Sequence, residues 1–221
     1  GVQSFIDDEL NLLGRLHGSE EAGYAVRAAA EAGFTNINLD LMSGLPGQTA
    51  DSWQRSLAKG LSLQATHLSL YQLTVEEGTP LASFVKDGCL VLPDEEVVLE
   101  MDDLTVSLCK DAGFERYETS NYCLQGYRCR HNINYWLNGE YLAAGASAVS
   151  YQQGVRQRRV ADPLEYIRLI RQNRSVVTER EQLSLEDSFR ETVIMGLRMG
   201  EGVSREALLD LFSQSGHRYH V

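Results

Sequence analysis

Residues 36–49 read Asn36-Ile-Asn-Leu-Asp-Leu-Met-Ser-Gly-Leu-Pro-Gly-Gln-Thr49, and this stretch decides the fold class. Its first half alternates polar and apolar residues, which predicts a β-strand with one polar face. A glycine-proline loop and a helix capped by Thr49 are expected to follow. A strand covered by helices is normally apolar on both faces, so the polar face of Asn36, Asn38 and Asp40 predicts a polar ligand near the carboxyl end of the strand. A tight turn that binds nothing is the alternative explanation of the loop.

Strands and helices alternate outward from this stretch. The pattern predicts strands at 1–5, 36–42, 67–74 and 114–121, and helices at 7–16, 19–32, 50–63 and 93–112. Ser19 is expected to cap the second of these helices. Alternation at this spacing is typical of right-handed parallel βαβ units.

The rhythm changes after residue 121. A final strand is expected within 140–151, and helices at 163–172, 184–199 and 204–214. The predicted fold class is therefore α/β: residues 1–160 form the C-terminal part of a partial (β/α) barrel, and residues 161–221 begin a mainly helical C-terminal domain that is incomplete. We expect the chain to be an internal piece of a longer protein.

Composition excludes several classes of protein. The 221 residues carry a formal net charge of −11, which argues against sequence-independent nucleic-acid binding. Arginines gather at 156–159 and 168–174, and a solvated face explains them better than an anion site. No stretch approaches the roughly 18 apolar residues of a membrane span. Four cysteines do not suggest a disulfide framework, so the expected location is the cytoplasm.

Three side chains on the first two strands and their connection suit a charged nucleoside. Gln3 and Asp40 are expected on neighbouring parallel strands, and Arg15 follows the first of them. A carboxylate accepts hydrogen bonds from both hydroxyls of a ribose diol, and an arginine fork binds a carboxylate. The plain alternative makes Asp40 a structural partner of Asn38 or Arg15.

These residues belong to a wider resemblance that covers nearly the whole chain. The blocks that carry it are Gly1-Val-Gln-Ser-Phe5, Arg15, 38–48, Ser69-Leu-Tyr71, Glu77-Gly-Thr-Pro80 and His131-Asn-Ile-Asn-Tyr-Trp136. Together they resemble the radical SAM proteins related to oxygen-independent coproporphyrinogen III oxidase, and within that group the haem-chaperone branch.

The resemblance implies a set of contacts to S-adenosylmethionine. By position, Gln3, Arg15 and Asp40 match the family residues that bind this cofactor, and a backbone contact is expected near Thr74. By residue type, Asp40 would hold the ribose hydroxyls and Arg15 the methionine carboxylate. The barrel of residues 1–160 is then the second part of a radical SAM barrel.

The block at 131–136 implies a second ligand. It matches the HNxxYW motif that the haem-chaperone branch links to haem binding, so His131 is the expected haem ligand. A lone histidine beside aromatic residues offers an axial nitrogen and flat apolar faces. A packed, hydrogen-bonded corner is the alternative reading of the same residues.

The cysteines do not match the family's cluster motif. A radical SAM 4Fe–4S cluster needs three cysteines spaced CxxxCxxC, and none of the four here has that spacing: Cys89, Cys109, Cys123 and Cys129. The cluster ligands are therefore expected upstream of Gly1, with no metal ligand in this segment. A disulfide between Cys123 and Cys129, or a metal site that they form with His131, is not expected.

The resemblance implies a haem chaperone that binds S-adenosylmethionine and a 4Fe–4S cluster and passes haem to haem-dependent respiratory proteins. The alternative is the oxidase itself, an enzyme that decarboxylates two propionates of a porphyrin precursor. An inactive barrel fragment is the third reading. Both a monomer and a homodimer remain open. Glu118 is expected to pair with Arg116 or Arg130 rather than to reach the pocket.

Overall fold

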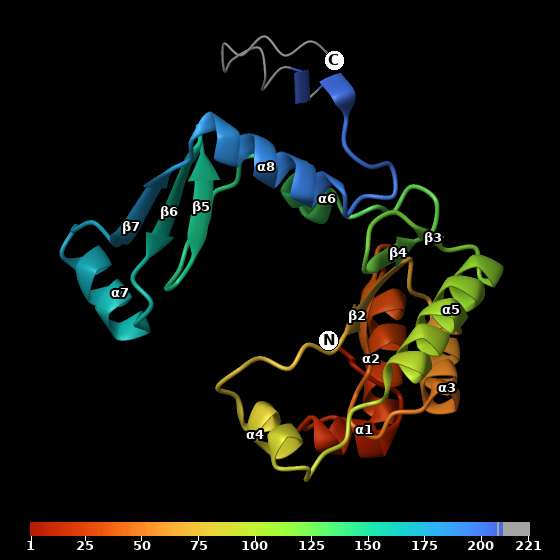
Figure 1. Cartoon of the computed structure of the whole chain (residues 1–221). Coiled ribbons are helices and arrows are strands. Elements are labelled where there is room, and N and C mark those ends of the chain that lie inside the picture. Colours follow the sequence, from red (N-terminus) through yellow and green to blue (C-terminus); the bar gives the residue numbers. More distant parts are fainter. Residues whose placement is uncertain (207, 210–221) are drawn as a thin grey trace. The chain divides into compact units, whose positions relative to one another are not determined.

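The computed structural model describes residues 1–206, 208 and 209, and the chain divides by its contacts into two units (Figure 1). The first unit spans Gly1–Arg128 and the second begins at Cys129. The domain boundary predicted near residue 160 lies inside the second unit. The predicted helix at 204–214 falls largely outside the described residues.

The first unit contains a four-stranded sheet in the order β1-β2-β4-β3. Its strands are β1 (Asn38–Ser43), β2 (His67–Gln72), β3 (Glu115–Arg116) and β4 (Asn121–Cys123). β1 and β2 are parallel, as predicted, whereas β4 runs antiparallel to both β2 and β3. The strand predicted at 1–5 is reduced to a single parallel bridge between Gln3 and Leu41.

The strand predicted at 114–121 is wrong, because this segment forms a hairpin. Tyr117, Glu118 and Ser120 lie in the turn between β3 and β4, and the first two are buried. The Glu118 carboxylate accepts the backbone N–H of Ser120 at 3.1 Å, a side-chain bond that satisfies the turn locally.

Five helices accompany this sheet: α1 (Asp7–Leu12), α2 (Ser19–Glu31), α3 (Ala50–Leu61), α4 (Pro80–Lys86) and α5 (Glu95–Asp111). Thr49 caps α3 as predicted, since its hydroxyl accepts the N–H of Ser52 at 3.1 Å. The cap predicted for α2 is wrong. Gly18 is the N-cap residue, and its N–H donates to the Glu21 carboxylate at 2.9 Å.

The core of this unit lies between the apolar face of the sheet and helices α3 and α5. Leu41 and Leu68 are fully buried there, and Trp53 of α3 is 1% exposed. The indole N–H of Trp53 donates to the hydroxyl of Thr105 on α5 at 2.8 Å. Each such side chain stabilises the unit by about 1.5–3 kcal/mol through burial. The apolar half of the 36–49 pattern therefore points into this core, which leaves the polar half for the opposite face.

The second unit is built on a three-stranded antiparallel sheet in the order β5-β6-β7. Its elements are α6 (Arg130–Trp136), β5 (Val149–Gln152), β6 (Val155–Arg159), α7 (Pro163–Arg171), β7 (Val177–Gln182) and α8 (Leu185–Gly196). The final strand expected within 140–151 corresponds to β5. β6 and β7 were not predicted, because β7 is exposed along its whole length and carries no buried apolar face.

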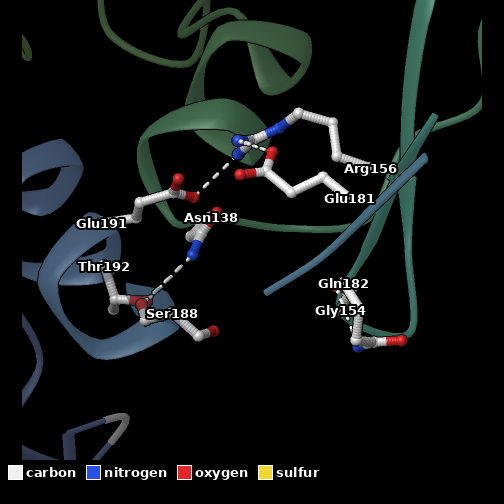
Figure 2. Close-up of polar contacts among 8 residues, drawn as sticks. All are labelled: Asn138, Gly154, Arg156, Glu181, Gln182, Ser188, Glu191 and Thr192. Atoms are coloured by element: carbon white, nitrogen blue, oxygen red, sulfur yellow. Dashed lines mark hydrogen bonds and ion pairs between the residues drawn. The ribbon is translucent and has the colours of Figure 1, made fainter. Parts of the chain in front are cut away.

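Ion pairs hold the polar strands of this second unit (Figure 2). Arg156 on β6 lies between Glu181 on β7, at 3.2 Å, and Glu191 on α8, at 2.8 Å. Arg158 pairs with Glu179 at 3.2 Å across the same two strands. The arginines at 156–159 thus include cross-strand partners of acidic residues. In the part of the chain that the structure describes, no helix is both long and apolar enough to cross a membrane.

Candidate functional site

The polar face of the first sheet carries the candidate site. The strand register places Asn38 opposite His67 and Asp40 opposite Ser69, and Ser69 opposite Asn121 on β4. Residues directly opposite one another point to the same face. Three strands therefore contribute polar side chains to one surface, while the leucines between them enter the core.

A chain of hydrogen bonds runs across this face. The amide Nδ2 of Asn38 donates to Asp40 Oδ1 at 2.7 Å. The amide oxygen of Asn38 lies 2.6 Å from His67 Nδ1 and accepts from the Ser69 hydroxyl at 3.2 Å. His67 Nε2 lies 2.8 Å from the hydroxyl of Tyr117. The chain leads from the half-exposed Asp40 to groups that are almost fully buried.

Burial governs the ionisation of His67. The ring is 4% exposed, and removal from water lowers the pKa of His67, because the charged form loses its hydration. The carboxylate of Asp40 acts in the opposite direction and is the weaker influence. His67 is therefore held as a neutral imidazole that links Asn38 and Tyr117.

Gln3 and Asp40 come together, as the sequence predicted. Gln3 donates its backbone N–H to the carbonyl of Asp40 at 2.7 Å and accepts the N–H of Met42 at 2.8 Å. A Cβ built on Gly1 would lie 2.0 Å from Gln3 Nε2 and 3.2 Å from Asp40 Oδ2. The Gln3 side-chain amide therefore lies against Gly1, where the side chain of a larger residue would be, and the Asp40 carboxylate lies beside it. Gln3 has a φ of 72°, a conformation that few non-glycine residues adopt.

Arg15 and Thr74 lie apart from this pair. Arg15 is exposed in the connection between α1 and α2, where it lines a hollow with Asp7 and Asn11. Thr74 is exposed just after the end of β2. Among the described residues, no contact joins either side chain to Gln3 or Asp40. The structure thus brings two of the four expected cofactor residues together.

Glu9 anchors the glycine-proline loop, a role that the sequence analysis missed. Its carboxylate is 8% exposed and accepts from the hydroxyls of Ser4 and Ser52 at 2.5 and 2.8 Å. It also accepts from the side-chain amide of Gln48 at 3.0 Å. Glu9 therefore ties the loop to the segment that contains Gln3. The sequence did not predict this role of Glu9, because acidic residues are common in the first turn of a helix.

Glu118 is buried beside Asn121 and does not form the predicted ion pair. One of its carboxylate oxygens accepts from the Asn121 amide and from the N–H of Ser120. Arg116 instead donates to the carbonyl of Thr119 at 2.6 Å. Within the described part of the chain, Glu118 Oε2 and Asn121 Oδ1 have no hydrogen-bond partner. Burial of these two oxygens without a donor destabilises the fold, because each loses its hydration with no hydrogen bond in return.

His131 lies in the second unit, at the start of α6. Its imidazole is exposed, and its ring meets Tyr135 edge-on with 4.9 Å between centroids. Tyr135 stacks on Tyr141 at 4.7 Å, and Tyr141 continues to Tyr151 at 6.2 Å. The histidine of the HNxxYW block thus begins a row of aromatic rings and keeps an accessible edge.

The end of α6 is fastened to α8. Asn138, just after the helix, donates from its side-chain amide to the hydroxyl of Thr192 at 3.1 Å (Figure 2). Trp136 carries the guanidinium of Arg198 over its ring, with 4.5 Å to the centroid. Both contacts fix the helix that bears His131. Residues 131–136 can therefore form a packed, hydrogen-bonded corner and still present His131 to a ligand.

The cysteines do not gather. None of the four is in a disulfide, and burial raises the pKa of the Cys109 thiol to about 12. Burial is also the main cause of the raised pKa of Cys123. Among the described residues, no group of three or more histidine, cysteine or acidic side chains is arranged to hold a metal ion. Cys109 and Cys123 are thus disfavoured as thiolates, which are the form that binds a cluster.

Comparison with solved structures defines the class of fold. The chain superposes on coproporphyrinogen III oxidase (HemN) from Escherichia coli, a radical SAM enzyme, with a TM-score of 0.75. The match covers 96% of this chain and 51% of that chain at 20% identity. The predicted fold class is confirmed: part of a radical SAM barrel followed by further structure. No family model matches the chain.

Curated relatives narrow the class. The chain is 36% identical over 97% of its length to the heme chaperone HemW of Bacillus subtilis, and 41% identical over 67% of its length to that of Escherichia coli. It is also 32% identical to a mitochondrial radical S-adenosyl methionine domain-containing protein 1 of Danio rerio. The chain is a HemW-like radical SAM protein, as the sequence blocks indicated. It spans about half the length of the curated relatives it matches.

Proposed function

We propose that the protein to which this chain belongs is a haem chaperone that binds S-adenosylmethionine and a 4Fe–4S cluster. Its cargo would be haem, delivered to haem-dependent respiratory proteins. The observation that carries the proposal is the pairing of the Gln3 backbone with β1 beside Asp40, in a chain whose curated relatives are named heme chaperones. We place the protein in the cytoplasm, where reducing conditions suit its thiols.

The polar face suits the nucleoside part of the cofactor. Asp40 keeps a side chain that is 34% exposed, with Oδ1 fixed by Asn38 and Oδ2 at 3.8 Å from the nitrogen of Gly1. That oxygen would accept from ribose hydroxyls, and the Gln3 amide would donate to or accept from the same ligand. Arg15 and Thr74 are proposed for the methionine carboxylate and a backbone contact, on the family resemblance alone.

The cluster does not fit the cysteines of this segment, so we assign its ligands to a part of the protein outside this chain. Reductive cleavage of the sulfonium is the chemistry that the cluster supplies in radical SAM enzymes. No residue described here takes part in holding it.

His131 is the proposed axial ligand of haem. Its imidazole is exposed, and Tyr135 and Trp136 place aromatic surface next to it. Among the described residues, no hydrogen bond occupies a ring nitrogen of His131, so a nitrogen is available to iron. The anchoring of α6 through Asn138 would hold that nitrogen in place.

Titration of the full-length protein with haem tests this function. We expect a shifted Soret band that the substitution His131→Ala removes. His17→Ala is the matched control, because His17 lies in the first unit, where its ring nitrogen contacts the carbonyl of Val2 at 3.3 Å. A Soret shift that survives His131→Ala contradicts the assignment of the ligand. Formation of protoporphyrinogen IX in an anaerobic assay would instead favour the oxidase.

A further inference from the structure

We propose that Asn38 is a positioning residue for Asp40, and that His67 and Tyr117 fix its orientation. The inference deepens the proposed function and rests on it, because Asp40 is the residue assigned to the ribose hydroxyls. It concerns the way in which a half-exposed carboxylate is held ready for a vicinal diol.

The hydrogen-bond partners permit one orientation of the Asn38 amide. Its Nδ2 faces Asp40 Oδ1 at 2.7 Å, and its oxygen faces His67 Nδ1 at 2.6 Å. Flipping the amide would set its oxygen against a carboxylate oxygen, and neither atom has a hydrogen to share. The ordered amide therefore requires a hydrogen on His67 Nδ1.

Burial fixes the rest of the chain. A neutral imidazole with its hydrogen on Nδ1 accepts at Nε2, so the Tyr117 hydroxyl, 2.8 Å away, is the donor. His67 and Tyr117 are 4% and 2% exposed, and water does not compete for these bonds. The hydrogen bonds therefore run in one direction, from the Tyr117 hydroxyl to His67, from His67 to the Asn38 oxygen, and from the Asn38 amide N–H to Asp40.

Only one oxygen of Asp40 takes part in this series of hydrogen bonds. Oδ1 is bound by Asn38, whereas Oδ2 lies 3.8 Å from the nitrogen of Gly1, accepts no hydrogen bond from a described side chain, and remains for a ligand. A carboxylate fixed in this way loses less rotational freedom when it binds, which raises affinity. The plain alternative is that Asn38 merely satisfies a surface carboxylate and has no effect on binding.

The test is a double-mutant cycle on the full-length protein, with S-adenosylmethionine affinity measured by calorimetry. We expect Asn38→Ala to weaken binding about tenfold, because it removes a hydrogen bond to a charged group. In an Asp40→Ala background the same substitution should cost nothing further. Ser62→Ala is the control, because Ser62 follows α3, and its hydroxyl donates to the carbonyl of Lys59 at 2.7 Å, away from Asn38 and Asp40.

Two further measurements separate positioning from structural support. The penalty of Asn38→Ala should be present with S-adenosylhomocysteine and absent with its 2′,3′-dideoxy analogue, which lacks the diol. If Asn38→Ala does not fold, His67→Gln, which keeps an N–H donor, should retain affinity that His67→Leu loses.

The outcomes distinguish the inference from the proposed function. If Asp40→Ala leaves affinity unchanged, Asp40 is not in the site and the proposed function loses its support. If Asp40→Ala weakens binding but Asn38→Ala has no effect, or an effect that simply adds to it, the positioning role is overturned while the site stands. Equal penalties with both S-adenosylhomocysteine ligands overturn the positioning role as well.

Discussion

Replacement of Glu9 by leucine should destabilise the first unit more than any single hydrogen bond would suggest. The carboxylate accepts three side-chain hydrogen bonds, from Ser4, Gln48 and Ser52, at 2.5, 3.0 and 2.8 Å. Bonds to a charged group contribute about 1.5–3 kcal/mol each, so simple addition gives roughly 4.5–9 kcal/mol.

The neighbouring acceptors reduce that sum. After the substitution, the Ser52 hydroxyl still reaches the carbonyl of Thr49 at 3.1 Å, and Ser4 still reaches Ser56 at 3.4 Å. Ser4 and the Gln48 amide are thus each left with one long contact, and that of Gln48 is to the carbonyl of Met42 at 3.4 Å. We therefore expect a loss of about 3–5 kcal/mol in the free energy of unfolding, as for a buried polar group that loses its partner.

Urea unfolding of the full-length protein, followed by tryptophan fluorescence, measures this loss. Glu9→Gln keeps one acceptor oxygen and should lose only about 1–2 kcal/mol. Glu20→Leu is the control, because Glu20 is exposed on α2 and should change the free energy by less than about 0.5 kcal/mol. If Glu9→Leu were no more destabilising than Glu20→Leu, the network around Glu9 would not support the loop, and this reasoning would be refuted.

Three other substitutions have defined outcomes. Arg15→Lys should weaken S-adenosylmethionine binding, because a point charge does not replace a two-pronged donor; calorimetry checks this, and equal affinity would remove Arg15 from the site. The pKa of His67 is lowered by burial, so the unfolded chain binds the proton more readily, and stability should be full above the ordinary pKa of 6.5 and decline as the pH falls below it. Urea midpoints between about pH 5 and 8 measure this, and His67→Gln should flatten the dependence. Trp53→Phe should cost about 1–3 kcal/mol in urea unfolding, since it leaves Thr105 without the indole donor and a smaller ring in the core.

The stretch at 36–49 was predictable because its signals are local. Alternation set the faces of β1, and Thr49 set the start of α3 with its own side chain. Both signals lie within a few residues of the structure they determine. The neighbouring Gln3 was also placed correctly, because a parallel strand must lie beside β1 in a βαβ arrangement.

The features that the sequence did not reveal depend on distant partners. β3 and β4 form a hairpin because β4 pairs with β2, and alternation is the same for one long strand or two short ones. β7 consists of exposed residues, two of which, Glu179 and Glu181, lie opposite arginines on β6, so its pattern contains no buried face to detect. The link between His67 and Tyr117 likewise joins two elements far apart in the chain.

The polar face of the sheet also explains why these residues are present at all. Ser69, His67 and Asn121 occupy positions that apolar side chains would fill at no cost in lost hydration, because each is less than 5% exposed. Stability alone therefore favours leucine or valine at such positions. A face that keeps buried polar groups, satisfies most of them through Asn38, and directs one carboxylate oxygen outward is arranged for a polar ligand.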